Sequence, residues 1–498
     1  MVNDFIVKKP EEEGLPSSAV KEFIDYIHEW KINLHSFMVV RHGNILAEGY
    51  YKPFHQDFPH RLYSSSKTYV AMAIGVLIGE GKLRLEDRLV EFFPEWIDRE
   101  QHKWMQDCTV EDALKMSVPV PVDTYFQTVS ERWAWTFFNV SYAAKPAGTV
   151  FHYNTSGTFI LDVLIEKLTG KTFLEVLRPV FDKIGVSKEI WCVKSPDGYA
   201  WGGSGVVCTL RDYAKFAELL LRKGEYNGEQ LLPRDYVERA TSKQIDNLYE
   251  NEFSIWRKTG YGYQVWITQD GYAMYGMGSQ YAFCFPEKDF LFVCQGDTQC
   301  AADRSGDLVY GGVKHLLYNR LQDEPLPKDE EGYQTMRQAL DDLTLFTDFG
   351  AKYSAFEKQL DGATYRLEEN SMGWKWIRFT FTGDEGVLTY ENARGEKQIK
   401  FGLNAYTVGT FPETHYYDTQ VGKPANRELD CMAAASWTEE KKLLLRVFIT
   451  DTNFGNCYMT FGFKGDEVGV MLCKRAEMFM DDYQGMAGGY LVKGENEK

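Results

Sequence analysis

Through the first two thirds of the chain, apolar positions recur with periods typical of both helices and strands. Residues 17–30 carry apolar side chains on one face, which predicts an amphipathic helix. Residues 36–51 contain two strand-like runs that flank His42-Gly43-Asn44, which predicts a hairpin. Residues 69–78 are apolar on all sides, which predicts a helix buried inside a domain.

Further along, two segments carry helix-start signals and one carries a set of strands. Residues 108–116 offer Thr109 as an N-cap with an acidic residue three positions later, and residues 209–221 repeat this arrangement at Thr209. Residues 261–296 contain several strand-like runs. Strands at both ends with helices between them predict a mixed α+β or α/β domain.

A domain boundary is expected after this region. Residues 322–332 are charged and contain two prolines, which is typical of a linker, and a helix is predicted at 333–343. Beyond it, short alternating runs separated by Gly, Asn and Asp turns predict a small antiparallel barrel or sandwich, with Trp374 and Trp376 on one face of a strand. The predicted divisions are 1–325 for the first domain, 326–344 for the linker and helix, and 345–498 for the all-β domain.

Charge and composition narrow the possible partners. The formal net charge of −17 disfavours nucleic acid and anionic membrane surfaces. The N-terminus lacks the apolar core of a secretory signal, and no run approaches about 18 uninterrupted apolar residues. The nine cysteines show no C-x-x-C pair and are interpreted as reduced, buried thiols. We therefore expect a cytoplasmic protein without a membrane span.

The predicted buried helix begins with a serine three positions before a lysine. On a helix, Ser64 and Lys67 would lie side by side. A serine becomes a nucleophile when a base takes its proton, and a lysine acts as that base once desolvation lowers its pKa. A second pair at the same spacing, Ser18 and Lys21, opens the first helix. A chain of this length should contain roughly two such serine–lysine pairs by chance. We therefore expect Ser18 to cap this helix and Lys21 to be solvated.

This helix start resembles that of the penicillin-recognising serine hydrolases. They include class C β-lactamases, D-Ala-D-Ala peptidases, and related esterases and 6-aminohexanoate-oligomer amidases. Residues 151–170, 201–221 and 275–293 resemble, in the same order, the family's second motif, glycine-rich turn and third-motif strand pair. The resemblance covers about residues 10–320. It implies a β-lactamase-like domain, with an antiparallel sheet flanked by helices and a helical subdomain, followed by a lipocalin-like barrel.

The resemblance also implies roles for individual residues. Ser64 would be the acylated nucleophile, Lys67 its general base, and Tyr153 the residue that helps to move the proton and protonates the leaving group. The backbone N–H groups of Ser64 and Met277 would form the oxyanion hole, with Ser279 as the fallback if the register shifts.

Two positions depart from the family's pattern. Thr155 stands where the second motif usually has Asn, and Met274 stands where the third motif, placed at Met274-Tyr275-Gly276, usually has Lys or His. Because that cation helps to bind the substrate carboxylate, its absence argues against a specialised β-lactamase or peptidoglycan carboxypeptidase and favours the esterase and amidase branch. The expected substrate-binding residues are Thr155, Tyr275, Gly276 and Trp201, although core packing accounts for the two aromatic residues equally well.

These features predict a serine hydrolase that acts through an acyl-enzyme on a small ester or amide, or an acyltransferase if another alcohol or amine intercepts the acyl group. The alternatives are a D-aminopeptidase, DD-peptidase or β-lactamase of the same fold, and a non-catalytic binding protein. No cofactor is expected, and no metal either, because the nine histidines lack metal-ligand spacing. The expected partner is a small-molecule substrate, and a homo-oligomer is left open.

Overall fold

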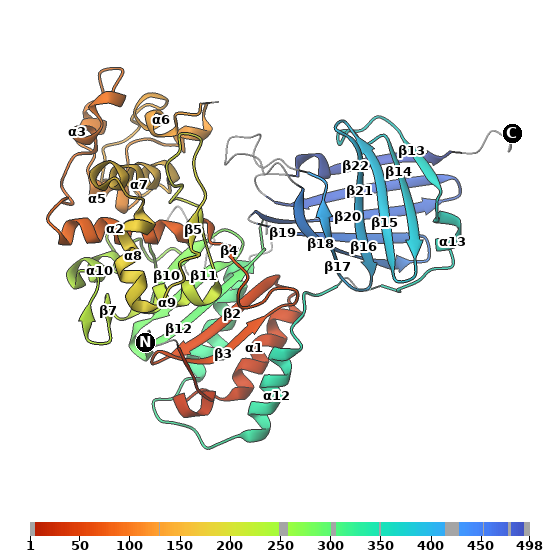
Figure 1. The fold of residues 1–498 in the computed structure, drawn as a ribbon, viewed down its shortest axis with the longest axis horizontal. Helices are drawn as coiled ribbons and strands as arrows, with labels where there is room; N and C mark the ends of the chain where they lie inside the picture. The colour runs from red at the N-terminus through yellow and green to blue at the C-terminus, as the bar shows by residue number, and fades with distance from the viewer. Residues whose placement is uncertain are drawn as a thin grey trace. The chain divides into compact units, whose positions relative to one another are not determined.

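The computed structural model describes residues 5–128, 130–248, 257–299, 305–347, 350–413, 428–451, 453–476 and 480–492. The chain divides into two compact units, which are shown in Figure 1. The first comprises residues 1–298 and 302–345, and the second comprises residues 299–301 and 346–498.

The first unit is organised around one large sheet. Among the described residues, its seven strands run in the order β1-β3-β2-β12-β11-β10-β9, and every pair is antiparallel except β1 with β3. Because β2 pairs with β12, the sheet joins the early hairpin to the later set of strands. The strands are β1 (Ile6–Val7), β2 (Leu34–Arg41), β3 (Asn44–Tyr50), β9 (Trp266–Thr268), β10 (Gly271–Gly276), β11 (Gln280–Phe285) and β12 (Phe290–Gly296).

Helices pack against this sheet. Strands β2, β11 and β12 are buried along their whole length, which requires cover on both faces because side chains alternate between them. α9 (Leu210–Leu221) packs on all three of these strands. α1 (Ser17–Glu29) packs through Phe23, whose ring meets Phe37 of β2 edge-on at a centroid distance of 5.5 Å.

Beside the sheet, a group of helices surrounds α2 (Ser66–Gly79). α2 packs against α7, α8 and α10, which explains why its sequence is apolar on all sides. The remaining α-helices of this unit are α3 (Leu89–Phe92), α4 (Lys103–Gln106), α5 (Val110–Leu114), α6 (Trp133–Asn139), α7 (Thr155–Thr169), α8 (Phe173–Ile184), α10 (Arg234–Ala240), α11 (Ser305–Gly312) and α12 (Glu330–Asp341).

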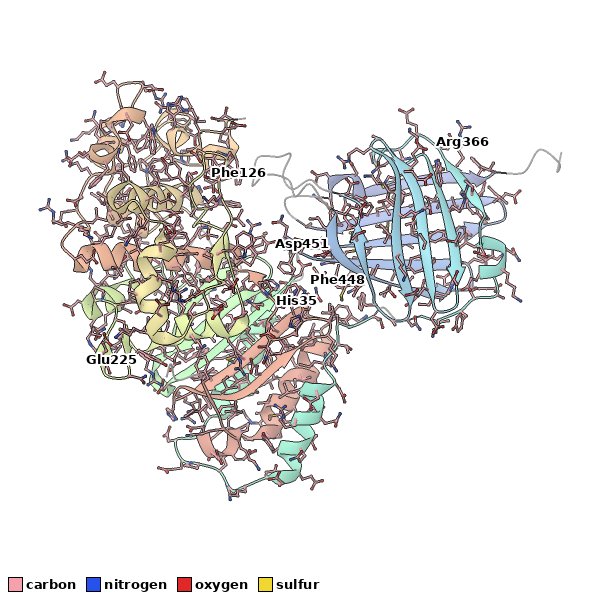
Figure 2. The ribbon with its side chains drawn as sticks, in the orientation of Figure 1. His35, Phe126, Glu225, Arg366, Phe448 and Asp451 are labelled. Atoms are coloured by element: carbon pink, nitrogen blue, oxygen red, sulfur yellow. The ribbon has the colours of Figure 1, made fainter. Side chains whose placement is uncertain are left out.

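A small sheet of β4 (His60–Arg61), β6 (Val206–Cys208) and β5 (Trp191–Cys192) leads into α2. His60 Nε2 lies 2.9 Å from Nδ1 of His35 on β2, which is labelled in Figure 2, and both rings are buried. Burial lowers the pKa of His35 well below its usual value and that of His60 to about 3. The neutral pair therefore ties the small sheet to the large one.

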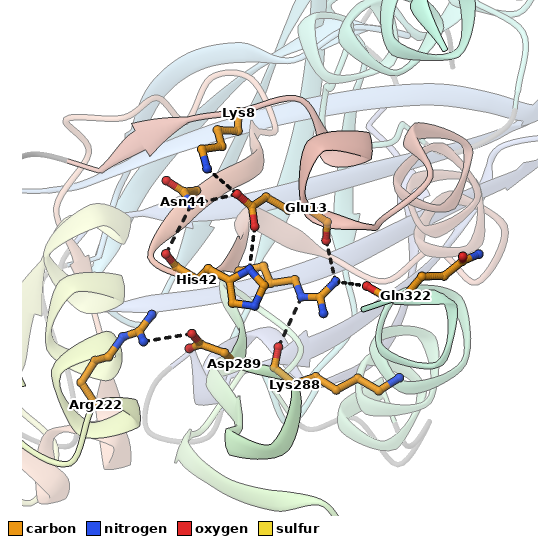
Figure 3. Close-up of polar contacts among 9 residues, drawn as sticks. Lys8, Glu13, His42, Asn44, Arg222, Lys288, Asp289 and Gln322 are labelled. Carbon is orange, nitrogen blue, oxygen red and sulfur yellow. Dashed lines mark hydrogen bonds and ion pairs between the residues drawn. The ribbon is translucent and has the colours of Figure 1, made fainter. Parts of the chain in front are cut away.

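Glu13 holds the tip of the β2–β3 hairpin (Figure 3). Its carboxylate accepts hydrogen bonds from His42 Nδ1 at 2.6 Å and from Asn44 Nδ2 at 3.1 Å. His42 and Gly43 have φ values of +50° and +74°, as a tight hairpin turn requires. The predicted hairpin is confirmed.

Other predictions for this unit can also be compared with the structure. Thr109 caps α5 in a capping box and Thr209 caps α9, as their spacing predicted. The helix predicted at 333–343 is α12, which packs on α1 and β3 and so belongs to the first unit. Within the described ranges, no helix combines the length and apolarity that crossing a bilayer requires.

The second unit is a closed β-barrel. Among its described residues, ten strands run in the order β16-β15-β14-β13-β22-β21-β20-β19-β18-β17, and β16 also pairs with β18, which closes a ring of nine. The strands are β13 (Thr364–Leu367), β14 (Trp376–Thr382), β15 (Glu385–Asn392), β16 (Gly395–Leu403), β17 (Thr407–Phe411), β18 (Leu429–Glu439), β19 (Lys442–Thr450), β20 (Phe454–Lys464), β21 (Glu467–Arg475) and β22 (Gly485–Leu491), with the short helix α13 (Glu357–Leu360) beside β14. The expected fold class, an α+β domain followed by an all-β domain, is confirmed.

The prediction that Trp374 and Trp376 share one face of a strand is wrong. β14 begins only at Trp376, because the chain turns at Gly373, where φ is +67°. Trp374 is buried and stacks on Tyr390 at a centroid distance of 4.0 Å. Trp376 is partly exposed, and its Nε1 donates to Glu391 at 2.7 Å.

Candidate active site

Ser64 lies at a strained turn between β4 and α2. The residue before it, Tyr63, has a φ of +47°, a left-handed conformation that is costly for a residue with a side chain. Ser64 is partly exposed, whereas Ser65 and Ser66 are buried. Of the three consecutive serines, the turn therefore presents Ser64 to solvent.

Ser65 and Ser66 anchor this turn to its surroundings. Ser65 Oγ donates to the Gln280 carbonyl of β11 at 2.8 Å. Ser66 Oγ accepts a hydrogen bond from the Val206 N–H of β6 at 2.9 Å. These bonds connect the start of α2 to two sheets and help to offset the strain at Tyr63.

Lys67 is buried directly beside Ser64. Its side chain is on the first turn of α2 and the residue is 1% exposed. Nζ lies 3.1 Å from Ser64 Oγ and donates to the Gly203 carbonyl at 2.5 Å. Burial lowers the pKa of Lys67 from 10.5 to about 7, and the negative charge of Asp123 opposes this shift. Near neutral pH, a substantial fraction of Lys67 is therefore a neutral amine that can accept a proton.

Tyr153 completes the group around the Ser64 hydroxyl. Lys67 Nζ lies 5.1 Å from the centroid of its ring. Burial raises the pKa of the Tyr153 phenol well above its usual value, and a hydrogen bond with the Ser64 side chain opposes the shift. The phenol therefore keeps its proton across the physiological range and can donate it.

The strand of the predicted third motif, β10, passes the turn that contains Ser64 at its C-terminal end. A Cβ on Gly276 would lie 2.1 Å from the Leu62 carbonyl oxygen, so only glycine permits this approach. Met277 follows in the turn to β11. Within the described part of the chain, neither the Ser64 amide nor the Met277 amide donates to a backbone carbonyl. Ser279, the fallback position, is buried, and its hydroxyl lies 2.7 Å from Thr298 Oγ1.

The second motif forms the N-terminus of α7. Asn154 is the N-cap, and its Oδ1 accepts from the Gly157 N–H at 3.0 Å. The Thr155 N–H donates to Asp123 Oδ1 at 2.5 Å. The Thr155 methyl lies against Gly203, where an added Cβ would be 2.5 Å from Thr155 Cγ2. Thr155 therefore adjoins the carbonyl that holds Lys67.

Aromatic side chains line up next to Tyr153. Trp266 stacks on the Tyr153 ring at a centroid distance of 5.6 Å, and Tyr275 meets Trp266 edge-on at 5.9 Å. The Arg257 guanidinium lies 4.6 Å from the centroid of the Tyr275 ring, and its charge lowers the pKa of Tyr153 slightly against the effect of burial. Tyr275 thus belongs to this cluster.

Trp201 is placed differently. It is 3% exposed and packs edge-on against Trp133 at a centroid distance of 5.5 Å. Arg61, which is fully buried, lies over its ring at 5.0 Å. These contacts put the indole in the core behind the glycine turn, which agrees with the core-packing alternative.

Three residues near Ser64 were missed at the sequence level: Asp123, Trp266 and Arg257. Asp123 lies in a segment without a motif, and its electrostatic effect on Lys67 emerges only from the fold. Trp266 begins the short strand β9, whose alternation did not distinguish a core residue from a site residue, and the Arg257 guanidinium lies 5.6 Å from the centroid of the Trp266 ring. The one available signal was the density of aromatic residues in this part of the chain.

The second serine–lysine pair is arranged differently. Ser18 is exposed on α1, and Lys21 Nζ pairs with Asp25 at 2.7 Å. In the described residues, no group of three or more His, Cys, Asp and Glu side chains is arranged to hold a metal ion.

Comparison with known proteins relates the chain to one family. A family model described as Beta-lactamase matches residues 31–295. The 6-aminohexanoate-dimer hydrolase of Paenarthrobacter ureafaciens is 24% identical over 222 residues, which is 41% of this chain and 56% of that protein. The chain thus spans about half the length of this relative.

Two solved structures align with parts or most of this chain. A structure designated a 6-aminohexanoate-dimer hydrolase from Bacillus anthracis aligns at a TM-score of 0.51 and 21% identity, over 63% of this chain and 86% of that one. The octameric penicillin-binding protein homologue from Pyrococcus abyssi aligns at a TM-score of 0.49 and 15% identity, over 95% of this chain and 99% of that one.

Proposed function

Because the chain belongs to the beta-lactamase family, we propose that it is a serine hydrolase that acts through an acyl-enzyme on a small ester or amide. The observation that carries the proposal is the pairing of Ser64 with Lys67. Nζ lies 3.1 Å from the Ser64 hydroxyl, and burial brings the pKa of Lys67 to about 7. A buried lysine beside a partly exposed serine is costly for stability and useful for activating a nucleophile.

Acylation follows from this arrangement. The Lys67 amine takes the proton of Ser64 while Oγ attacks the substrate carbonyl carbon, and a tetrahedral oxyanion forms. The Ser64 and Met277 amides donate to that oxyanion. Tyr153 gives its proton to the leaving alcohol or amine as the bond to it breaks, and the proton on Lys67 then restores Tyr153. Water repeats these steps on the acyl-enzyme and releases the acid.

The substrate side of the site favours esters and amides without a β-lactam ring. Met274, where a cation would bind the carboxylate of a β-lactam, is fully buried. The aromatic cluster of Trp266 and Tyr275 suits an apolar acyl or leaving group. The name of the relative from Paenarthrobacter ureafaciens adds linear amides to the substrates worth testing.

The experiment is a panel of p-nitrophenyl esters and anilides, with intact-mass detection of the acyl-enzyme. We expect wild type to gain the acyl mass and Ser64→Ala to gain none. Ser18→Ala is the matched control, because Ser18 also precedes a lysine by three positions but is exposed on α1. Equal turnover in wild type and Ser64→Ala, with no acyl mass on either, would sink the proposal. Strong labelling of wild type by a fluorescent penicillin would favour the β-lactamase or peptidase alternative.

A further inference from the structure

Asp162 is a buried carboxyl group close to, but outside, the Ser64 cluster. It is on α7 and is 0% exposed. One oxygen, Oδ2, accepts a hydrogen bond from the Gly202 N–H at 2.9 Å. Within the described part of the molecule, the other oxygen, Oδ1, has no hydrogen-bond partner. Burial raises the pKa of Asp162 well above its usual value, and the nearby Glu166 raises it further.

The amide that Asp162 binds belongs to the buried glycine-rich turn at 202–205, in which only Ser204 has a side chain. Its Oγ accepts a hydrogen bond from the Arg61 guanidinium at 3.2 Å. A Cβ on Gly202 would lie 2.3 Å from Val70 Cγ2, so α2 and α7 leave room only for glycine there. The turn is closely packed, and hydrogen bonds to its backbone also fix its position. The Ser204 and Gly205 amides donate to the Trp201 carbonyl at 3.0 and 2.7 Å. Arg61 supplies a further bond at the far end, where Nε donates to the Ser204 carbonyl at 2.9 Å. Asp162 supplies one at the near end.

Between these two anchors lies the carbonyl that holds the proposed base. Gly203 O accepts from Lys67 Nζ at 2.5 Å. A neutral amine has two hydrogens and one lone pair. When one hydrogen is committed to Gly203, the rotation of Nζ is restricted and its lone pair can face Ser64 Oγ. The direction of the Gly203 carbonyl therefore determines how well Lys67 can accept the serine proton.

We propose that Asp162 is a positioning residue for the reaction: by binding the Gly202 amide it fixes the Gly203 carbonyl, which orients the Lys67 amine toward Ser64. This inference rests on the proposed function. A purely structural role explains the residue poorly, because an apolar side chain of similar size would fill the site without burying a carboxyl group that lacks a second partner.

The test compares Asp162→Leu and Asp162→Asn. Leucine has the same branched shape at a larger volume and cannot accept the Gly202 hydrogen bond, whereas asparagine matches aspartate in size and keeps an acceptor oxygen. Asp212→Leu is the matched control: Asp212 is also buried on a helix, and its Oδ1 accepts from the Ser187 N–H at 2.8 Å. That bond does not involve the turn that holds Lys67.

Two readouts separate positioning from stability. The first is the titration of Lys67 by NMR of carbon-13-labelled lysine in the Ser64→Ala background, which needs no turnover. A displaced carbonyl stabilises the ammonium less, so Asp162→Leu should lower the Lys67 pKa by about one unit. The second is the acylation rate, which should fall about 10- to 100-fold in Asp162→Leu and only a few-fold in Asp162→Asn. Asp212→Leu should lower the melting temperature and change neither readout.

The outcomes are distinguishable. Asp162→Leu with the wild-type Lys67 titration and acylation rate overturns the Asp162 proposal, whatever its melting temperature. If Asp162→Leu fails to fold, Asp162→Asn with a rate as low as that of Ser64→Ala also overturns it, because the acceptor is retained. If wild type gains no acyl mass, the proposed function is overturned instead. The pKa of Lys67 in the Asp162 variants then still shows whether Asp162 controls the Lys67 amine.

Discussion

Replacing Lys67 with methionine should stabilise the protein below neutral pH while abolishing acylation. Methionine fills a similar volume without a charge. In the folded protein burial lowers the pKa of Lys67 to about 7, whereas the reference value is 10.5. The unfolded chain therefore binds more protons than the folded one between those two values, so the wild-type lysine costs stability at low pH and this cost disappears as the pH rises toward 10.5.

The size of the effect follows from the same shift. The difference between 10.5 and about 7 corresponds to a cost of about 5 kcal/mol at and below neutral pH. Methionine also loses the hydrogen bonds of Nζ to Ser64 and Gly203, which together are worth about 2–3 kcal/mol. The variant should thus be more stable than wild type by about 2–3 kcal/mol near pH 6 and less stable near about pH 10.

Urea unfolding followed by tryptophan fluorescence at these two pH values measures the difference. The barrel is identical in both proteins, so only the transition of the first unit should move. Lys21→Met is the matched control, because Lys21 forms a surface pair with Asp25 and should show no trend with pH. A Lys67→Met variant that is no more stable than wild type near pH 6, or whose advantage does not shrink with rising pH, would refute the burial argument.

Four further predictions concern the rate and specificity of acylation. The acylation rate of wild type should rise with pH around a midpoint near 7 as Lys67 loses its proton, which stopped-flow release of p-nitrophenol will show. Tyr153→Phe should lower that rate by about 10²–10⁴-fold, with a smaller change in KM; a rate within a few-fold of wild type would remove Tyr153 from proton transfer. Gly276→Ala should impair acylation more than substrate binding, because its Cβ would meet the Leu62 carbonyl at 2.1 Å; unchanged kinetics would show that β10 can move away. Arg257→Gln should lower kcat/KM for an ester that carries a carboxylate more than for its neutral isostere, since the guanidinium lies beside Tyr275; equal losses would argue against charge selection.

The elements that support the site could be predicted because their signals are local. The all-apolar run behind Lys67 predicted a helix buried on every side, and α2 is such a helix. The turn signal at His42 and Gly43 predicted the hairpin that starts the sheet. The failure at Trp374 has the same origin: alternation was extrapolated back to Trp374, which belongs to the turn before β14, where its N–H donates to Asn370 Oδ1 at 3.2 Å. A periodic pattern is informative only as far as the backbone remains regular.

The residues that the sequence did not reveal act through the backbone or through charge across the fold. Asp123 influences Lys67 from a segment without a motif, and Asp162 reaches it through the amide of Gly202 and the carbonyl of Gly203. No sequence spacing connects these positions. A hydrogen bond to a backbone amide can be made to almost any residue type, so the partner's side chain gives no signal in the sequence. The same reasoning separates the two serine–lysine pairs. At Ser18 the pair is complete in one helical turn and faces solvent, whereas at Ser64 the pKa of the lysine depends on burial and on the charge of Asp123. A catalytic lysine is therefore recognised by what surrounds it, and the sequence indicated those surroundings only through the order of the other motifs along the chain.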